Sequence, residues 1–379
     1  MNILFLTEDF PPMPGGIAMF LSELCKGLTR RGHEIKVLAH EMPDSDQYDL
    51  KQPYSIIRYP VPGRLSSVRI GYQILRQIIK KKPDVLFLGH VMATRGFPVL
   101  LFKWGFRMPY VVLCHSDDLR IADVSKINRI STYSLMRNAD LILANSEFTR
   151  RLLIRSSFLG EKIKILNPGV DTNLFFPSND QTMIRKTRLK YNADEIPLVI
   201  SVGRLVPRKN HEGLIRAIAD LRDQGILVKC IIVGGGPEKV NLERSIERLR
   251  LERHVSLMGH TSFKRLRELY QVADVVTLPS IAYKGSYEGF GIVALEASAC
   301  GKPVIVGSEG GQSESVIPDK TGIIVDAEDH SNIAKAIAYL IDREDVRDQM
   351  SNAGRAYAVE NFSWIKIAQR AATLLSKVK

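Results

Sequence analysis

The stretch LVISVGRLVPRKN, residues 198–210, determines the fold class of this chain. It opens with an apolar run, Leu198 to Val202, which is followed by a glycine turn, a loop with three cations and a helical pattern over Glu212 to Leu221. A short apolar strand that leads through a glycine turn into an amphipathic helix is typical of a parallel sheet covered by helices on both faces. The stretch therefore predicts an α/β fold.

The same unit recurs on both sides of this stretch. Downstream, the predicted strands are Lys229–Val233, Val255–Met258, Val275–Leu278, Pro303–Val306 and Gly322–Val325, and the predicted helices are Val240–Arg250, Phe263–Val272 and Ile292–Ala299. Upstream, the predicted strands are Ile3–Leu6, Ile35–Leu38, Val85–Leu88, Tyr110–Cys114, Leu141–Ala144 and Ile163–Leu166. The pattern indicates two α/β units.

A polar stretch, residues 177–195, separates the two patterns, and 379 residues exceed what one hydrophobic core usually serves. We therefore expect an N-terminal Rossmann-like domain, 1–176, and a C-terminal domain, 177–362. The last helical pattern, 363–378, is expected to pack back onto the first domain.

Composition places the chain among globular proteins. It is 45% hydrophobic and 25% charged, and four scattered cysteines without a C-x-x-C pair indicate buried thiols in a reducing compartment. We see no targeting segment and no membrane-spanning run, so we expect a cytoplasmic protein. The net charge of +12 suits anionic membranes, nucleic acid or phosphorylated ligands, and by itself leaves these open.

The first candidate site is the loop from Gly203 to Lys209. Arg204, Arg208 and Lys209 follow a strand end, where parallel α/β sheets bind their ligands. Guanidinium and ammonium groups so close together fit a diphosphate, and the alternative is a solvated basic loop.

The second candidate is YEGFGIVALEA, residues 287–297. Its glycines stand at the entry of a predicted helix, with Glu288 in the entry loop and Glu296 in the helix. Eight residues at helical rise would separate the two carboxylates by about 12 Å, too far for a glycosidase pair. That span suits a nucleotide sugar, with its diphosphate against the helix N–H groups. An ordinary solvent-facing glutamate and an N-cap glutamate are the alternative.

Three further features fit two alternatives, contact with a ligand or a structural turn. Gly15 and Gly16 precede a helix start, Gly234 to Gly236 follow a strand, and His115 follows another with Asp117 and Asp118 behind it. The glycines at 234–236 do not form a dinucleotide fingerprint because Lys239 stands where glycine is needed, which argues against a dehydrogenase. We interpret Asp44-Ser-Asp46 as a solvated turn, not a metal motif.

Residues Arg64 to Lys82 form a further helical pattern. Val68, Tyr72, Leu75 and Ile79 share one face, with Arg69, Arg76 and Lys80 on a flank. This pattern fits either a helix that packs on the sheet with a solvated basic edge or a peripheral contact with an anionic membrane.

Together these segments resemble the family 4 retaining glycosyltransferases of the GT-B fold, in which two Rossmann-like parallel-sheet domains face an interdomain cleft. The E-x7-E segment, the Gly203–Lys209 loop and the Gly15-Gly16 loop occur in the order of that family, and Asn167-Pro-Gly-Val-Asp171 is similar to its N-G-V-D segment.

The resemblance implies residue roles. His115, Arg204, Lys209 and Glu288 would be catalytic, with Arg204 and Lys209 on the donor diphosphate. The donor would also be contacted by Gly15, Gly16, Gly203, Met258, Gly259, His260, Gly289, Phe290, Gly291, Ile292, Val293 and Glu296. A nucleotide-sugar donor is implied as co-substrate, with no metal and no other cofactor.

Asp9-Phe-Pro-Pro with Arg204-Leu-Val-Pro-Arg-Lys209 resembles the phosphatidylinositol-mannoside mannosyltransferases. This implies a retaining hexosyltransferase that moves mannose from GDP-mannose to a lipid-linked or glycan acceptor in cell-envelope synthesis, at the inner face of the cell membrane and without a nucleic-acid partner. A UDP-sugar-dependent enzyme of the same family and a non-catalytic sugar-nucleotide-binding protein are the alternatives.

Overall fold

The computed structural model describes residues 1–13, 15–60, 66–91, 96–122 and 124–378. The chain divides into two compact units. Unit 1 comprises Met1–Pro168 and Trp364–Lys379, and unit 2 comprises Gly169–Ser363. The division falls at residue 168, not at 176, because residues 169–176 belong to unit 2, where Val170 and Phe175 are buried in its core.

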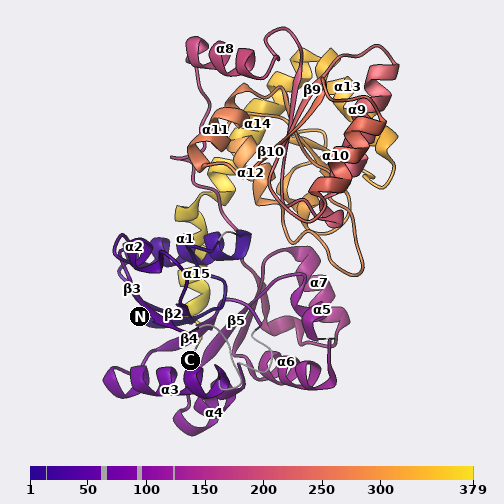
Figure 1. Cartoon of the computed structure of the whole chain (residues 1–379). Coiled ribbons are helices and arrows are strands. Elements are labelled where there is room, and N and C mark those ends of the chain that lie inside the picture. Colours follow the sequence, from indigo (N-terminus) through magenta and orange to yellow (C-terminus); the bar gives the residue numbers. More distant parts are fainter. Residues whose placement is uncertain (14, 61–65, 92–95, 123, 379) are drawn as a thin grey trace. The chain divides into compact units, whose positions relative to one another are not determined.

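Unit 1 is drawn from indigo to magenta in Figure 1, with the last helix in yellow. It is built on a seven-stranded parallel sheet with strand order β3-β2-β1-β4-β5-β6-β7. Its strands are β1 (Asn2–Leu6), β2 (Glu34–His40), β3 (Ser55–Tyr59), β4 (Val85–Leu88), β5 (Tyr110–Cys114), β6 (Leu141–Ala144) and β7 (Ile163–Ile165). Strand β3 was not predicted, because Ser55 and Arg58 interrupt its apolar pattern at the edge of the sheet.

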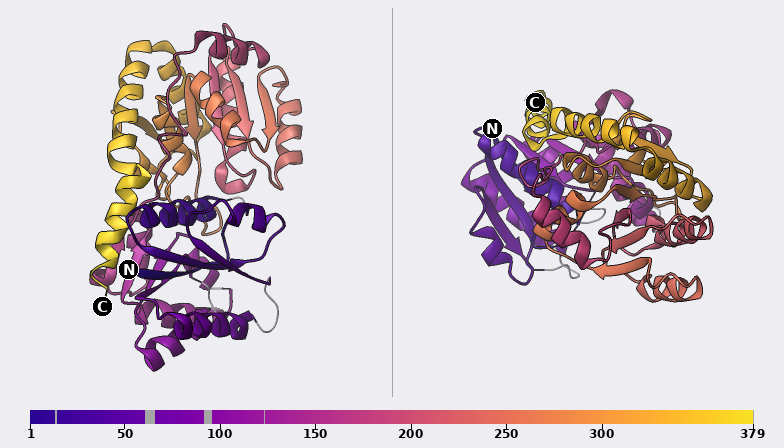
Figure 2. Two further views of the ribbon diagram at one scale, coloured as in Figure 1. Left: turned by 90° about the vertical axis from the view of Figure 1, so that its left-hand side faces the viewer. Right: turned by 90° about the horizontal axis from the view of Figure 1, so that it is seen from above.

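Helices cover both faces of this sheet (Figure 2). They are α1 (Gly16–Arg30), α2 (Ser45–Asp49), α3 (Ser66–Lys80), α4 (Phe97–Phe106), α5 (Asp118–Ala122), α6 (Lys126–Asn138), α7 (Glu147–Arg155) and α15 (Trp364–Leu375). Helices α1 and α15 pack on one face, and α3, α4 and α6 pack on the other. The last helix therefore lies in unit 1, where an added Cβ on Gly27 of α1 would stand 2.5 Å from Cβ of Ala368.

Unit 2 contains a six-stranded parallel sheet with strand order β10-β9-β8-β11-β12-β13. Its strands are β8 (Leu198–Val202), β9 (Lys229–Val233), β10 (Val255–Gly259), β11 (Val275–Leu278), β12 (Val304–Gly307) and β13 (Gly322–Val325). Its helices are α8 (Gln181–Lys190), α9 (His211–Asp223), α10 (Lys239–Arg248), α11 (Phe263–Val272), α12 (Ile292–Ala299), α13 (His330–Asp342) and α14 (Glu344–Phe362). Two Rossmann-like parallel sheets covered by helices define the GT-B fold, as predicted.

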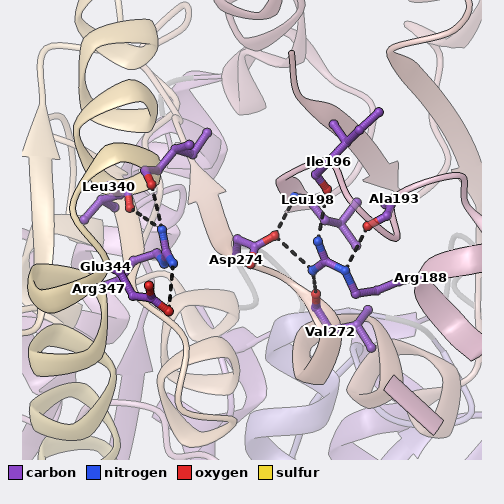
Figure 3. A network of polar contacts seen from close by, with 10 residues as sticks. Arg188, Ala193, Ile196, Leu198, Val272, Asp274, Leu340, Glu344 and Arg347 are labelled. Atoms are coloured by element: carbon purple, nitrogen blue, oxygen red, sulfur yellow. Dashed lines mark hydrogen bonds and ion pairs between the residues drawn. The ribbon is translucent and has the colours of Figure 1, made fainter. Parts of the chain in front are cut away.

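The polar stretch at 177–195 is not an open linker, since it contains α8. Arg188 of this helix donates hydrogen bonds to the carbonyl oxygens of Ala193, Ile196 and Val272, and to Asp274 Oδ2 at 3.0 Å (Figure 3). The same carboxylate oxygen accepts from Leu198 N at 2.7 Å. One arginine thus joins α8 to the start of β8 and the end of α11.

Candidate functional site

The basic loop of unit 2 follows β8 and leads into α9 through a short 3-10 turn, Pro207–Lys209. It is tied to the end of β9, because Gly203 N donates to Val233 O and Leu205 N donates to Gly235 O, both at 2.9 Å. At Gly234 an added Cβ would stand 1.9 Å from Gly203 O, so only glycine fits there. An added Cβ on Gly236 would likewise stand 2.3 Å from Leu205 O, so Gly234 and Gly236 allow the close packing of this loop.

Two cations of the loop meet the first glutamate of the 287–297 segment. Arg208 Nη1 and Lys209 Nζ each lie 2.6 Å from Glu288 Oε2. Burial by itself raises the pKa of this carboxyl, but Lys209 and Arg208 stabilise the ionised form and lower it to about 2. Glu288 is therefore a fixed negative charge between two cations.

One contact in this loop was not predicted. Arg208 accompanies Lys209 on Glu288, whereas Arg204 is exposed, and the binding of the donor diphosphate by Arg204 and Lys209 stays a prediction. Arg208 was noticed in the loop but was not among the predicted site residues. Its position next to Lys209 was the available signal, since a buried carboxylate needs more than one partner to stay ionised.

Helix α12 begins directly behind Glu288. Gly291 precedes it with φ +89°, and no side chain caps the helix start at Ile292 and Val293. The backbone N–H groups there are oriented for an anion. Phe290, by contrast, is buried and its ring centroid lies 5.5 Å from that of Phe362, so its side chain belongs to the core.

Glu296 lies just over one turn into α12. Its Oε2 accepts a hydrogen bond from Tyr270 OH of α11 at 2.9 Å, and burial raises its pKa to about 7 although this hydrogen bond lowers it. Because α12 starts only at Ile292, helical rise does not apply across all eight residues from Glu288, and the 12 Å argument does not hold in that form. Tyr270 was not predicted, since nothing in its local sequence connects it with Glu296.

Met258, Gly259 and His260 lie at the carboxyl end of β10, next to the basic loop. His260 is exposed and stands against the glycine turn, since an added Cβ on Gly235 would be 2.5 Å from His260 Nε2. The carboxyl ends of β8, β9 and β10 therefore lie side by side, with the basic loop after β8 and residues 258–260 at the end of β10.

The other predicted site residues belong to unit 1. Gly15 and Gly16 are exposed at the start of α1. His115 follows β5 and is buried, with Nδ1 3.3 Å from Asn145 Nδ2 and Nε2 3.3 Å from Gly89 O. Burial, together with the charge of His90, lowers the pKa of His115 to about 4, so its ring is neutral near pH 7.

Sequence reasoning missed a second polar group beside His115. His90 follows β4, and its Nε2 lies 3.8 Å from Glu8 Oε2. Asp118 accepts from His115 N at 2.7 Å, and burial raises the pKa of its carboxyl to about 7. Burial lowers the pKa of His90, but Glu8, Asp118 and Asp9 outweigh this and raise it. The strand order reverses between β1 and β4, where doubly wound sheets bind ligands.

Two minor predictions can also be checked. The four cysteines are buried free thiols, as predicted. Asp44 and Asp46 lie at the short helix α2 and not in an open turn, and among the described residues no group of three His, Cys, Asp or Glu side chains is placed to hold a metal ion.

The helix predicted over 64–82 exists as α3, and Arg64 lies outside the described residues. Of the two alternatives given for this helix, sheet packing through the face of Val68, Tyr72 and Ile79 was wrong, and membrane contact through that face stays a prediction. Ile70, Ile74 and Ile78 pack on the sheet, whereas Val68 and Tyr72 point to solvent. The error arose because the helix has two apolar stripes on opposite sides. Among the helices in the described ranges, none is long and apolar enough to cross a membrane.

Two family models match the chain. "Glycosyltransferase Family 4" matches residues 14–174, and "Glycosyl transferases group 1" matches residues 183–357. A GT-B fold together with these two family matches defines a nucleotide-sugar-dependent glycosyltransferase. The chain belongs to glycosyltransferase family 4 and is a retaining hexosyltransferase. This membership excludes the dehydrogenase and the non-catalytic binding protein.

Two curated relatives are similar over their whole length. The GDP-mannose-dependent alpha-(1-6)-phosphatidylinositol monomannoside mannosyltransferase of Mycolicibacterium smegmatis is 31% identical over 99% of this chain and 98% of its own. The GDP-mannose-dependent monoacylated alpha-(1-6)-phosphatidylinositol monomannoside mannosyltransferase of Corynebacterium glutamicum is 27% identical, over 98% of this chain and 97% of its own.

Among solved structures, Anabaena HepE in complex with UDP and glucose superposes with a TM-score of 0.83 at 25% identity, over 99% of both chains. Family 4 enzymes use nucleotide-sugar donors, which agrees with the predicted co-substrate.

Proposed function

We propose that this enzyme transfers mannose from GDP-mannose to a lipid-linked acceptor in cell-envelope synthesis, at the inner face of the cell membrane. One observation carries the donor site: Arg208, Lys209 and Glu288 converge in front of the uncapped start of α12. The choice of GDP-mannose and of a lipid acceptor rests on the full-length similarity to the mannosyltransferase of Mycolicibacterium smegmatis.

In this proposal the donor diphosphate lies against the N–H groups of Ile292 and Val293 and between Arg204 and Lys209. The bond from the anomeric carbon to the phosphate oxygen breaks, and a bond to the acceptor oxygen forms on the same face of the sugar. The departing phosphate oxygen takes the acceptor's proton. Arg204 and Lys209 offset the charge that develops on this oxygen, a kind of stabilisation worth roughly 10²- to 10³-fold in rate.

The remaining predicted roles are part of the same proposal. Glu288 orients the hydroxyls of the transferred sugar, and Glu296 holds the ribose with support from Tyr270. Met258, Gly259 and His260 line the base. His115, Gly15 and Gly16 of unit 1 contact the donor as the family resemblance implies, and His115 would do so as a neutral imidazole.

A transfer assay tests the proposal. Enzyme is incubated with radiolabelled GDP-mannose or UDP-glucose and with vesicles that contain phosphatidylinositol monomannoside, and label in the extracted lipid is counted. We expect label from GDP-mannose, and strong loss of it in Glu296→Ala and in Glu288→Gln. Label from UDP-glucose alone would favour the second candidate, which the similarity to the UDP complex of HepE supports. Full activity in both variants would overturn the assignment of the site.

A further inference from the structure

Helices α3, α4 and α6 form one layer on the same face of the unit 1 sheet (Figure 1). They contact one another in that order along the layer. Gly71 of α3 lies against Pro98 of α4, where an added Cβ would stand 3.4 Å from Pro98 Cβ. Lys103 of α4 donates to Asp140, just beyond α6, at 2.6 Å. Their outward sides therefore form a continuous surface, here called the α3–α4–α6 surface.

Many of the solvent-exposed side chains on this surface are apolar. Its exposed large hydrophobic side chains are Val68, Tyr72 and Ile79 on α3, Phe97, Leu101, Trp104 and Phe106 on α4, and Ile127 and Ile130 on α6. Trp104 keeps 63% of its surface in solvent, and Ile130 keeps 69%. Scattered exposed hydrophobics are ordinary, but a group of this size on adjacent helices marks a surface that is covered in use.

The same helices have a one-sided charge. They hold seven Lys and Arg residues and not one Asp or Glu. The exposed cations include Arg69, Arg76 and Lys80 of α3, and none of these three has an ion-pair partner in the described part of the chain. A surface that is apolar and predominantly cationic complements an anionic bilayer, whose headgroups attract the cations and whose interface accepts aromatic side chains.

Helix α6 offers a place for a headgroup. The guanidinium carbons of Arg129 and Arg137 each lie 5.7 Å from the ring centroid of Tyr133. These three side chains, with Ile130 and Ser134, line a hollow of about 370 Å³. Both guanidinium groups are exposed, and each can bind a lipid phosphate oxygen through paired N–H donors.

We propose that the α3–α4–α6 surface docks on an anionic phospholipid bilayer and that Arg129 and Arg137 bind lipid phosphate there. This extends the membrane contact predicted for residues 64–82 to two further helices. It rests on the proposed function only in the reason given for docking, which is that docking brings the enzyme to a lipid acceptor. The apolar side chains enter the interface, and the cations hold the helices parallel to it.

Vesicle sedimentation tests the apolar part. Wild-type protein is mixed with vesicles of phosphatidylcholine, alone or with phosphatidylglycerol. We expect binding to the mixed vesicles and at least a tenfold lower partition coefficient in the variant Leu101→Ser/Trp104→Ser/Ile130→Ser. The matched control is Leu189→Ser/Leu227→Ser/Val240→Ser, three comparably exposed side chains of unit 2, which should bind like wild type.

A second pair of variants tests the contribution of the cations to vesicle binding. Each Lys or Arg at an anionic surface contributes about fivefold in partition. Arg129→Gln/Arg137→Gln should therefore bind the mixed vesicles roughly 25-fold more weakly, and the difference should shrink at high salt. Arg244→Gln/Arg248→Gln in unit 2 removes the same charge from a surface that also holds Glu212 and Glu238, and should change little.

The outcomes are distinct. Equal sedimentation of wild type and the apolar variant would overturn the proposal, and so would equal binding with and without phosphatidylglycerol. A dimer in sedimentation velocity that the apolar variant abolishes, without vesicle binding, would assign the surface to a second copy of the chain. GDP-mannose binding, measured without vesicles, should be the same in all variants, so failure of the donor assignment is recognised separately.

Discussion

The carboxyl ends of the two parallel sheets differ in the ionisation state of their buried side chains. In unit 2 the edge gathers Arg208 and Lys209 on Glu288, and the pKa of that carboxyl falls to about 2. In unit 1 the corresponding edge buries His115 and Asp118, whose pKa values move to about 4 and about 7. Glu288 of unit 2 stays ionised between its two cations, whereas these two groups of unit 1 move toward their neutral forms.

The difference indicates which ligand each edge suits. Paired cations around an ionised carboxylate are organised for a diphosphate, which brings its own charge and can take over the cations. Neutral imidazole and a carboxyl near its pKa can donate and accept hydrogen bonds without a fixed charge, which suits hydroxyl groups. One architecture, used twice, thus provides an ion-paired carboxylate at one sheet and a pair of nearly neutral polar groups, His115 and Asp118, at the other.

The largest effect is expected for Lys209→Ala, which removes a cation beside Glu288. Loss of one cation that stabilises the leaving group should lower kcat by roughly 10²- to 10³-fold. The control is Arg216→Ala, which removes an exposed cation of α9 that pairs with Glu212 at 3.0 Å. Initial rates of transfer measure both. Equal losses in the two variants would mean that general charge, and not the cation beside Glu288, supports the reaction.

The second prediction concerns the unit 1 edge and pH. A histidine with a lowered native pKa binds fewer protons in the folded state, so its contribution to stability rises with pH between about 4 and 6.5. A carboxyl with a raised native pKa binds more protons in the folded state, so its contribution falls between about 3.8 and 7. In the wild type the two slopes oppose each other.

Asp118→Asn removes the contribution to stability that falls as pH rises and leaves the contribution of His115, which rises with pH. Between about pH 4.5 and 6, the unfolding free energy of this variant should gain up to about 1.4 kcal/mol per pH unit relative to wild type. Both tryptophans, Trp104 and Trp364, belong to unit 1, so urea unfolding followed by tryptophan fluorescence reports on this unit. Parallel pH profiles for the two proteins would show that Asp118 is ionised in the folded state.

The smallest effect is expected for Tyr270→Phe. The variant removes the hydroxyl that donates to Glu296 and leaves the buried ring in place, so the donor KM should rise about fivefold with little change in kcat. Tyr191→Phe is the control, because its hydroxyl accepts from Arg265 elsewhere in unit 2. If kcat falls and KM does not change, Glu296 acts on the transition state and not on the bound donor.

Much of the fold followed from local pattern. Strands β5, β6, β8, β9 and β11 and helices α11 and α12 match their predicted bounds, because buried parallel strands are short continuous apolar runs. Strand β3 and helix α8 were missed, since an edge strand and a surface helix carry mixed sequences. Helix α3 was found, but its buried face was not, because two apolar stripes compete and only packing decides between them.

The candidate site was predictable in part. Lys209 and Glu288 could be identified because glycines and charges stand together at a strand end and a helix start. Their direct contact, the role of Arg208, and the Tyr270 bond to Glu296 depend on residues far apart in the chain. His90 and Glu8 form another pair of this kind, 82 positions apart, which local pattern does not reveal.

Calorimetric titration of the wild-type enzyme with GDP-mannose and with UDP-glucose tests the central claim most directly. Our account predicts that GDP-mannose binds at least tenfold more tightly and that Lys209→Ala weakens its binding. Tighter binding of UDP-glucose, or unchanged GDP-mannose affinity in Lys209→Ala, would contradict it.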